Sequence, residues 1–152
     1  MTSAVTPLDP LAALLRGEWR DPDGSAPIRI PPLAVAIERS LAGREADLVA
    51  PLGLGRRLAV VSDATTRDVL GARVERALAR AATVEAVVLD GTPHADASTV
   101  ERLRQACAGA DALVAVGSGT INDLCKYAAA QDGKPYAVFA TAPSMNGYTS
   151  KN

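Results

Sequence analysis

The chain has 152 residues, a formal net charge of −1 and a hydrophobic content of 48%, which suit a single globular domain with a sizeable core. The slightly acidic balance argues against nucleic-acid binding, which normally needs a basic patch, and no apolar run is long enough to cross a bilayer. Because aromatic residues make up only 3% of the chain, the core must be aliphatic.

Cysteine and histidine usage limits the chemistry that these residues can supply. Cys107 and Cys125 occupy mostly apolar positions of predicted helices, so we expect small core residues in a reducing cytosol, and neither a disulfide nor a metal pair. His94 is the only histidine, so a metal site with two or more histidine ligands cannot be built within this sequence. Because the two cysteines are expected to be reduced thiols, the protein is expected to be cytoplasmic.

The first third of the chain carries weaker signals. Residues 1–27 are rich in proline, glycine and aspartate, which predicts a loop-like extension with a short helix at 11–15 and Trp19 as its candidate anchor. Residues 28–30 predict a short edge strand. A helix is predicted over 33–49, because its apolar residues can share one face: Leu33, Ile37, Leu41, Leu48 and Val49.

From residue 57 onward, apolar strands alternate with amphipathic helices. The predicted strands are 57–62, 84–89, 112–116 and 135–140. The predicted helices are 66–81, one that starts at a capping box over 98–101, and 120–130. This alternation predicts an α/β fold, a Rossmann-like parallel sheet flanked by helices. Ligands of such folds bind beyond the carboxyl ends of the strands, so the residues that follow three strands should converge there: Asp63, 117–120 and 141–144.

The segment 111–126 carries the strongest functional signal. Gly117 and Gly119 remove side chains from a strand-to-helix turn, and Thr120 or Asn122 is expected to cap the helix that follows. Such a turn directs free backbone N–H groups and the positive end of a helix dipole at one place, which favours an anion such as phosphate. The alternative is a tight turn with nothing bound. Asn122 stands where a third glycine would complete a dinucleotide-binding fingerprint.

Three charged residues near this turn have two interpretations each. Asp63 ends the first strong strand, where a carboxylate can accept hydrogen bonds from a ribose diol or cap the next helix. Asp123 and Lys126 lie three residues apart on the helix after the turn. They could hold a ribose or substrate hydroxyl, or pair with each other at the surface.

Three motifs together resemble a known family. Residues 116–123 (VGSGTIND), 133–136 (GKPY) and 141–150 (TAPSMNGYTS) resemble the sn-glycerol-1-phosphate dehydrogenases. These belong to the superfamily of iron-containing alcohol dehydrogenases, glycerol dehydrogenase and 3-dehydroquinate synthase, and the resemblance runs from about residue 28 to 152. It implies an NAD(P)-dependent enzyme in which a following helical domain supplies one Asp and two His to zinc or a similar divalent ion.

The resemblance also implies a domain plan. Residues 1–27 would be an N-terminal extension, 28–140 the dinucleotide-binding α/β domain, and 141–152 an active-site loop leading to a C-terminal helical metal-binding domain that is absent from this sequence. The 152 residues are therefore expected to be the first part of a longer protein and to be inactive alone.

Site roles follow from the resemblance, position by position. The adenosine ribose would meet Asp63, and the nicotinamide side would be lined by Thr141 and Ser144. The pyrophosphate would be held by Gly117, Ser118, Gly119 and Thr120. The catalytic side would be formed by Asp123, Lys126 and Asn146. Glycerol-1-phosphate and glycerol dehydrogenases usually carry Asp where this chain has Asn146, so the substrate stays open.

The implied activity is hydride transfer between NAD or NADP and a polyol phosphate. Two alternatives remain open from sequence: a 3-dehydroquinate-synthase-like lyase that uses NAD transiently, and a stand-alone nucleotide-binding domain without catalysis. A small phosphorylated polyol is the expected partner, with no nucleic acid and no membrane. Apolar surface around 141–150 and the helix after Gly119 would favour self-association, so a homo-oligomer is expected.

Overall fold

The computed structural model describes residues 9–20, 22–24, 26–30 and 32–142. These residues fall into two compact units, one reaching up to Ile37 and the other beginning at Glu38. The domain bounds expected from the sequence, at 28 and 140, stay a prediction. None of the helices in the described ranges is both long and apolar enough to span a membrane.

The described residues of the first unit contain one short helix, α1 (Pro10–Arg16). The Asp9 carboxylate accepts a hydrogen bond from the Leu11 N–H at 3.1 Å and caps the helix. Trp19 and Ile28 form a single antiparallel bridge. The expected helix is thus confirmed, whereas the expected strand over 28–30 is wrong, because only this bridge forms.

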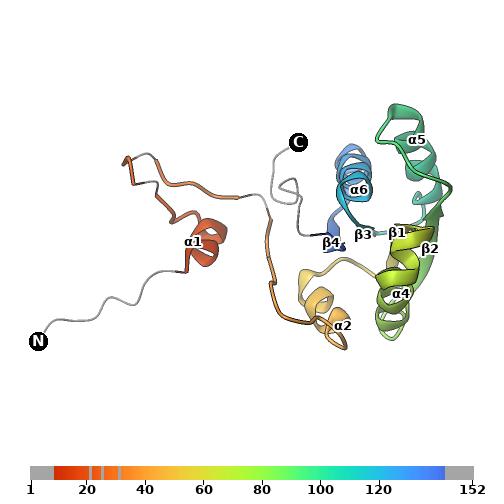
Figure 1. The fold of residues 1–152 in the computed structure, drawn as a ribbon, viewed down its shortest axis with the longest axis horizontal. Helices are drawn as coiled ribbons and strands as arrows, with labels where there is room; N and C mark the ends of the chain where they lie inside the picture. The colour runs from red at the N-terminus through yellow and green to blue at the C-terminus, as the bar shows by residue number, and fades with distance from the viewer. Residues whose placement is uncertain (1–8, 21, 25, 31, 143–152) are drawn as a thin grey trace, which may run out of the picture. The chain divides into compact units, whose positions relative to one another are not determined.

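The second unit is built on a four-stranded sheet in the order β2-β1-β3-β4, and every neighbouring pair is parallel (Figure 1). The strands are β1 (Arg57–Asp63), β2 (Thr83–Leu89), β3 (Ala112–Gly117) and β4 (Tyr136–Ala140). All four were predicted, and each strand end agrees within one residue. The α/β fold class is confirmed.

Helices cover both faces of this sheet. The helical segments are α2 (Glu45–Val49), η1 (Ala50–Leu52), α3 (Ala64–Thr66), the π-helical η2 (Arg67–Gly71), α4 (Ala72–Leu78), α5 (Ala97–Ala106) and α6 (Gly119–Gln131). Figure 1 shows α5 and α6 on one side of the sheet and α2 and α4 on the other. Since both faces are covered, all six residues of β3 are buried, as expected for a parallel sheet.

The core divides by the alternation of side chains along each strand. Ala59 and Val61 of β1 pack with α5 and α6, in one cluster that includes Leu103 and Ile121. The intervening residues, Leu58 and Val60, belong to the second cluster, which contains residues of α2 and α4.

Cys107 and Cys125 are both buried free thiols in the cluster on the α5 and α6 side. Burial raises the pKa of the Cys107 thiol to about 11, and burial also raises the pKa of Cys125. Both thiols therefore stay protonated at neutral pH, and the predicted core role of the two cysteines is confirmed.

The helix predicted over 33–49 is wrong for most of its length. Only Glu45–Val49 is helical, and Leu33 and Ile37 are 82% and 81% exposed. Gly43 adopts a left-handed backbone with a φ of 82°, which interrupts a helix at that point. Apolar spacing alone does not stabilise a helix whose face has no surface to pack against.

The start of α5 also differs from the prediction. The N-cap is Asp96, whose carboxylate accepts from the Thr99 N–H and the Ser98 hydroxyl, both at 2.8 Å. The bond from the Thr99 backbone is the main cause that lowers the pKa of Asp96. The capping box expected at 98–101 is therefore wrong, because an aspartate two residues earlier supplies the cap.

Asp111 joins β1 to the loop before β3 at the amino edge of the sheet. Its Oδ2 accepts from the N–H groups of Arg56 and Arg57 at 2.9 Å each, and its Oδ1 lies 3.1 Å from the Arg57 guanidinium. The loop passes close because Gly55 has no side chain, since a Cβ there would lie 2.5 Å from the Asp111 Cβ. The backbone bonds from Arg56 and Arg57 are the largest causes that lower the pKa of Asp111.

This geometry predicts a pH-dependent contribution to stability. Because the pKa of Asp111 is lower in the folded state, its contribution is present above the ordinary aspartate pKa of about 3.9 and is lost as pH falls through the folded value. We expect Asp111→Asn to lower the melting temperature at pH 7, with a difference from wild type that shrinks below about pH 4. Thermal denaturation across pH measures this, and a constant difference would contradict it.

Candidate functional site

β1 and β3 are the two central strands of the sheet, and their connections lead to opposite edges. From β1 the chain crosses to β2 on one side, and from β3 it crosses to β4 on the other. The two strands are neighbours, paired up to Val61 with Ala115, so Asp63 and Gly117 end side by side, each two residues beyond that pair. In open α/β sheets a point where two connections diverge in this way leaves a crevice in which ligands bind.

A glycine turn connects β3 to α6 at this edge. Gly117 is the last residue of β3, Ser118 is the N-cap and α6 begins at the buried Gly119. A Cβ on Gly117 would lie 2.6 Å from the Cβ of Ile121, so the first turn of α6 can pack here only against a glycine. The role of Thr120 or Asn122 as cap is therefore wrong, since both lie inside the helix.

The N-terminus of α6 lacks the side-chain cap that three other described helices possess. Ser118 makes no capping hydrogen bond, whereas aspartates cap α1, α3 and α5. The first N–H groups of a helix need partners, and its dipole favours a negative charge at this end. The α6 terminus at the β1/β3 crevice thus combines the features of an anion site.

Asp63 caps the short helix that follows β1. Its Oδ1 accepts from the Thr66 N–H at 2.7 Å, and the Asp63 N–H donates to the Thr66 hydroxyl at 3.1 Å, which completes a capping box. The structure therefore supports the capping interpretation. The cap uses Oδ1, so the ribose interpretation of the same half-buried carboxylate stays a prediction.

Asp123 and Lys126 both lie on α6, in different environments. Asp123 is exposed and accepts from the Asn122 side-chain N–H at 3.1 Å. Lys126 is only 8% exposed, which is rare for a lysine. Their predicted roles beside a nicotinamide ribose stay predictions.

Thr141 comes directly after β4 and lies at the same edge. Its N–H donates to the Gly117 carbonyl at 3.1 Å, which joins the ends of β3 and β4. The predicted convergence is thus confirmed for Asp63, the glycine turn and Thr141. Ser144 and Asn146 lie outside the described residues.

Sequence reasoning missed the burial of Asn122 at this edge of the sheet. This residue is completely buried in the first turn of α6, and its Oδ1 has no hydrogen-bond partner. The sequence presented it as a candidate cap or as the replacement for a third glycine. The available signal was a polar residue directly beside the apolar stripe of α6, and that signal does not reveal burial.

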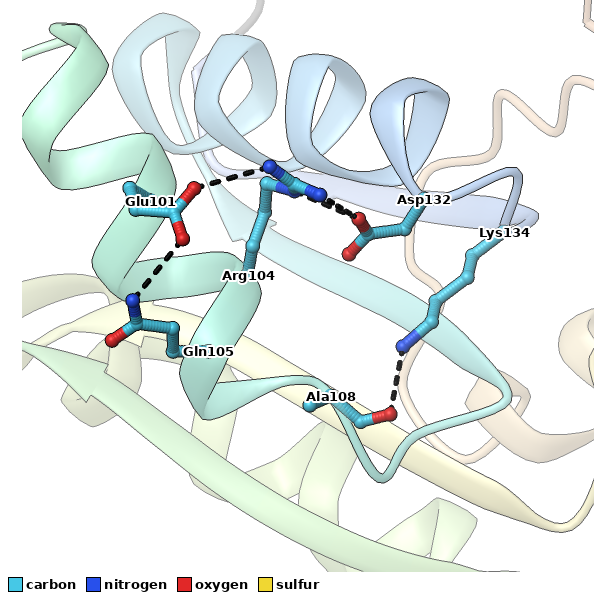
Figure 2. Close-up of a pocket in the computed structure, with 6 residues that line it drawn as sticks. All are labelled: Glu101, Arg104, Gln105, Ala108, Asp132 and Lys134. Carbon is cyan, nitrogen blue, oxygen red and sulfur yellow. Dashed lines mark hydrogen bonds and ion pairs between the residues drawn. The ribbon is translucent and has the colours of Figure 1, made fainter.

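A shallow hollow of about 400 Å³ at the other end of α5 and α6 is a structural junction (Figure 2). Arg104 lies 2.6 Å from Asp132 and 3.1 Å from Glu101. Lys134 donates to the carbonyls of Cys107 and Ala108 at 2.8 and 3.2 Å, at the C-terminal end of α5. Because these charges are paired within the protein, the hollow offers little to a ligand.

Comparison with known proteins identifies the family. Residues 36–152 match the profile of the family described as iron-containing alcohol dehydrogenase. The chain belongs to this family. The predicted superfamily is therefore confirmed.

A curated relative supports the resemblance at the level of sequence. A glycerol-1-phosphate dehydrogenase [NAD(P)+] from Bacillus licheniformis is 36% identical over 100 residues, which cover 62% of this chain and 25% of the relative. The chain thus spans about a quarter of the length of this relative.

Two solved structures are similar in fold. A probable glycerol dehydrogenase from Sinorhizobium meliloti 1021 is 29% identical with a TM-score of 0.56, covering 69% of this chain and 28% of that one. A glycerol dehydrogenase from Schizosaccharomyces pombe is 18% identical with a TM-score of 0.61, covering 70% and 27%, and it shows likeness of fold alone.

Proposed function

We propose that this chain is the dinucleotide-binding domain of an NAD(P)-dependent dehydrogenase that acts on a phosphorylated polyol of the sn-glycerol 1-phosphate or dihydroxyacetone phosphate type. The observation that carries the proposal is the N-terminus of α6, which lies at the β1/β3 crevice without a side-chain cap. The Bacillus licheniformis relative is a glycerol-1-phosphate dehydrogenase, which supports the choice of substrate class.

The residues of the crevice fit a dinucleotide. In this proposal the pyrophosphate lies against the backbone of Gly117, Ser118, Gly119 and Thr120. Asp63 accepts from the adenosine ribose hydroxyls, and its charge disfavours a 2′-phosphate, so NAD is preferred over NADP. Thr141 and Ser144 line the nicotinamide side.

In this proposal the catalytic side of the site is formed by Asp123, Lys126 and Asn146. The nicotinamide ring, when bound, accepts or donates the hydride. Asp123 and Lys126 would orient the ribose and the substrate hydroxyl from α6. Among the described residues of 9–142, no group of three or more His, Cys, Asp or Glu could hold a metal ion. A zinc-like ion belongs, in this proposal, to a helical domain of the full-length protein.

Isothermal titration calorimetry with NAD⁺ and NADP⁺ tests the proposal. We expect NAD⁺ to bind and Gly119→Asp to weaken binding at least about tenfold, because a carboxylate would occupy the place of the pyrophosphate. Gly109→Asp is the matched control, since it adds the same charge beside the amino edge, where a Cβ meets nothing within 4 Å. Circular dichroism verifies that both variants fold. Absence of binding to wild type, or equal loss in both variants, would refute the assignment.

Self-association belongs to the same proposal. Among the described strands β2 pairs only with β1, so its outer edge is open, and Val88 on it is 39% exposed. Tyr127 on α6 is 50% exposed. Light scattering on the calorimetry samples reports the oligomeric state, and a monomer at high concentration would count against a homo-oligomer.

A cytoplasmic location is likewise proposed, supported by the two free buried thiols.

A further inference from the structure

The side-chain amide of Asn122 has a hydrogen-bond partner for its nitrogen and none for its oxygen. Its Nδ2 donates to the Asp123 carboxylate at 3.1 Å, while its Oδ1 is buried without a hydrogen-bond partner. Because a carboxylate accepts only, the bond to Asp123 fixes the nitrogen on that side and turns the oxygen away from it. The orphan atom is therefore an acceptor held in a fixed orientation.

The position of Asn122 places this acceptor beside the candidate anion site. The Asn122 N–H donates to the Ser118 carbonyl at 3.0 Å and so closes the first turn of α6. With a rise of about 1.5 Å per residue, Asn122 lies within roughly 5 Å of the helix start along the axis.

Asn122 also differs from its buried neighbours on α6. Ile121, Leu124 and Cys125 are apolar and pack into the aliphatic cluster, whereas Asn122 is equally buried but polar. Lys126, one turn further along, shares its flank and is 8% exposed. This flank is therefore buried but polar. An unsatisfied carbonyl in such a place costs free energy, and a ligand that satisfies it recovers that cost.

We infer that Asn122 positions the Asp123 carboxylate and that its Oδ1 accepts a hydrogen bond from a hydroxyl group of the ligand held at the N-terminus of α6. This inference rests on the proposed function. An acceptor requires a donor, and an ionised phosphate has none, whereas the hydroxyl groups that lie next to a phosphate in a ribose or a polyol phosphate can donate. Two ligands carry such a hydroxyl: the dinucleotide, through a ribose, and the polyol phosphate.

Asn122→Leu separates a ligand role from a structural role. Leucine has a similar size and removes the orphan carbonyl, so we expect the melting temperature to rise by about 2–4 °C while the dissociation constant for NAD⁺ rises about tenfold. A purely structural asparagine would not combine higher stability with weaker binding. Gln131→Leu, at the exposed end of the same helix, is the matched control and should change neither quantity.

The same titrations, repeated with glycerol 1-phosphate as the ligand, distinguish the two sources of the hydroxyl. If Asn122→Leu weakens the binding of NAD⁺ alone, the hydroxyl belongs to a ribose of the dinucleotide. If it weakens the binding of glycerol 1-phosphate alone, the hydroxyl belongs to the polyol. The inference is overturned if Asn122→Leu binds both ligands as wild type does, or if it melts below wild type. Failure of the proposed function is a separate result, since wild type itself would then bind neither NAD⁺ nor NADP⁺, and the role of Asn122 would fall with it.

Discussion

Replacing Gly117 with alanine is expected to destabilise the protein by about 3 kcal/mol, at the upper end of the cost of overpacking a core. The added Cβ would lie 2.6 Å from the Cβ and 2.7 Å from the Cγ1 of Ile121. Ile121 is 1% exposed and packed within the aliphatic cluster, so it has little room to move. For a chain of this size, the melting temperature should fall by roughly 6–12 °C, which differential scanning calorimetry measures.

Gly109→Ala is the control for this prediction. A Cβ at Gly109 meets nothing within 4 Å, and its φ lies outside the left-handed region, so the substitution should leave stability unchanged or raise it by about 0.4–1 kcal/mol. Equal melting temperatures for Gly117→Ala and wild type would show that α6 can shift at its start. In that case the turn would not owe its shape to the contact with Ile121.

The sheet could be predicted from sequence because its strands are short apolar runs set between turns. In β3, a run without a charge predicts burial on both faces, and all six residues are buried. The carboxyl ends of parallel strands share one edge, so the convergence of Asp63, Gly117 and Thr141 followed from strand order in the chain. These inferences need only local pattern and the parallel arrangement.

Features that depend on contacts between distant residues could not be predicted. Leu33 and Ile37 have the spacing of a buried helix face, but spacing does not show whether a surface exists to cover them. Asp96 is the N-cap of α5 and Ser98 lies inside the helix, although both residue types are common N-caps. Glu45 is 1% exposed and lies 2.6 Å from Arg73, an ion pair that joins α2 to α4 across 28 positions of sequence.

The candidate site shows the same limit. The sequence identified the glycine turn, because two glycines between an apolar strand and a helix form a local pattern. It gave no reason to separate the buried Asn122 from the exposed Asp123, since both are polar residues one position apart. Their difference arises from the rotation of α6 on the sheet, which the packing of Ile121 against Gly117 sets.

Two leucines of this chain, Leu103 and Leu33, should respond very differently to truncation. Leu103 of α5 is 0% exposed, and Leu103→Ala is expected to cost about 2–5 kcal/mol, because it removes apolar contacts and leaves a cavity between α5 and the sheet. Leu33 is 82% exposed, and Leu33→Ala should change the free energy of unfolding by no more than about 0.5 kcal/mol. Urea denaturation of both variants measures the difference. A large loss for Leu33→Ala would mean that its apolar side chain is covered in solution, and the helix predicted from spacing alone would then have to be reconsidered.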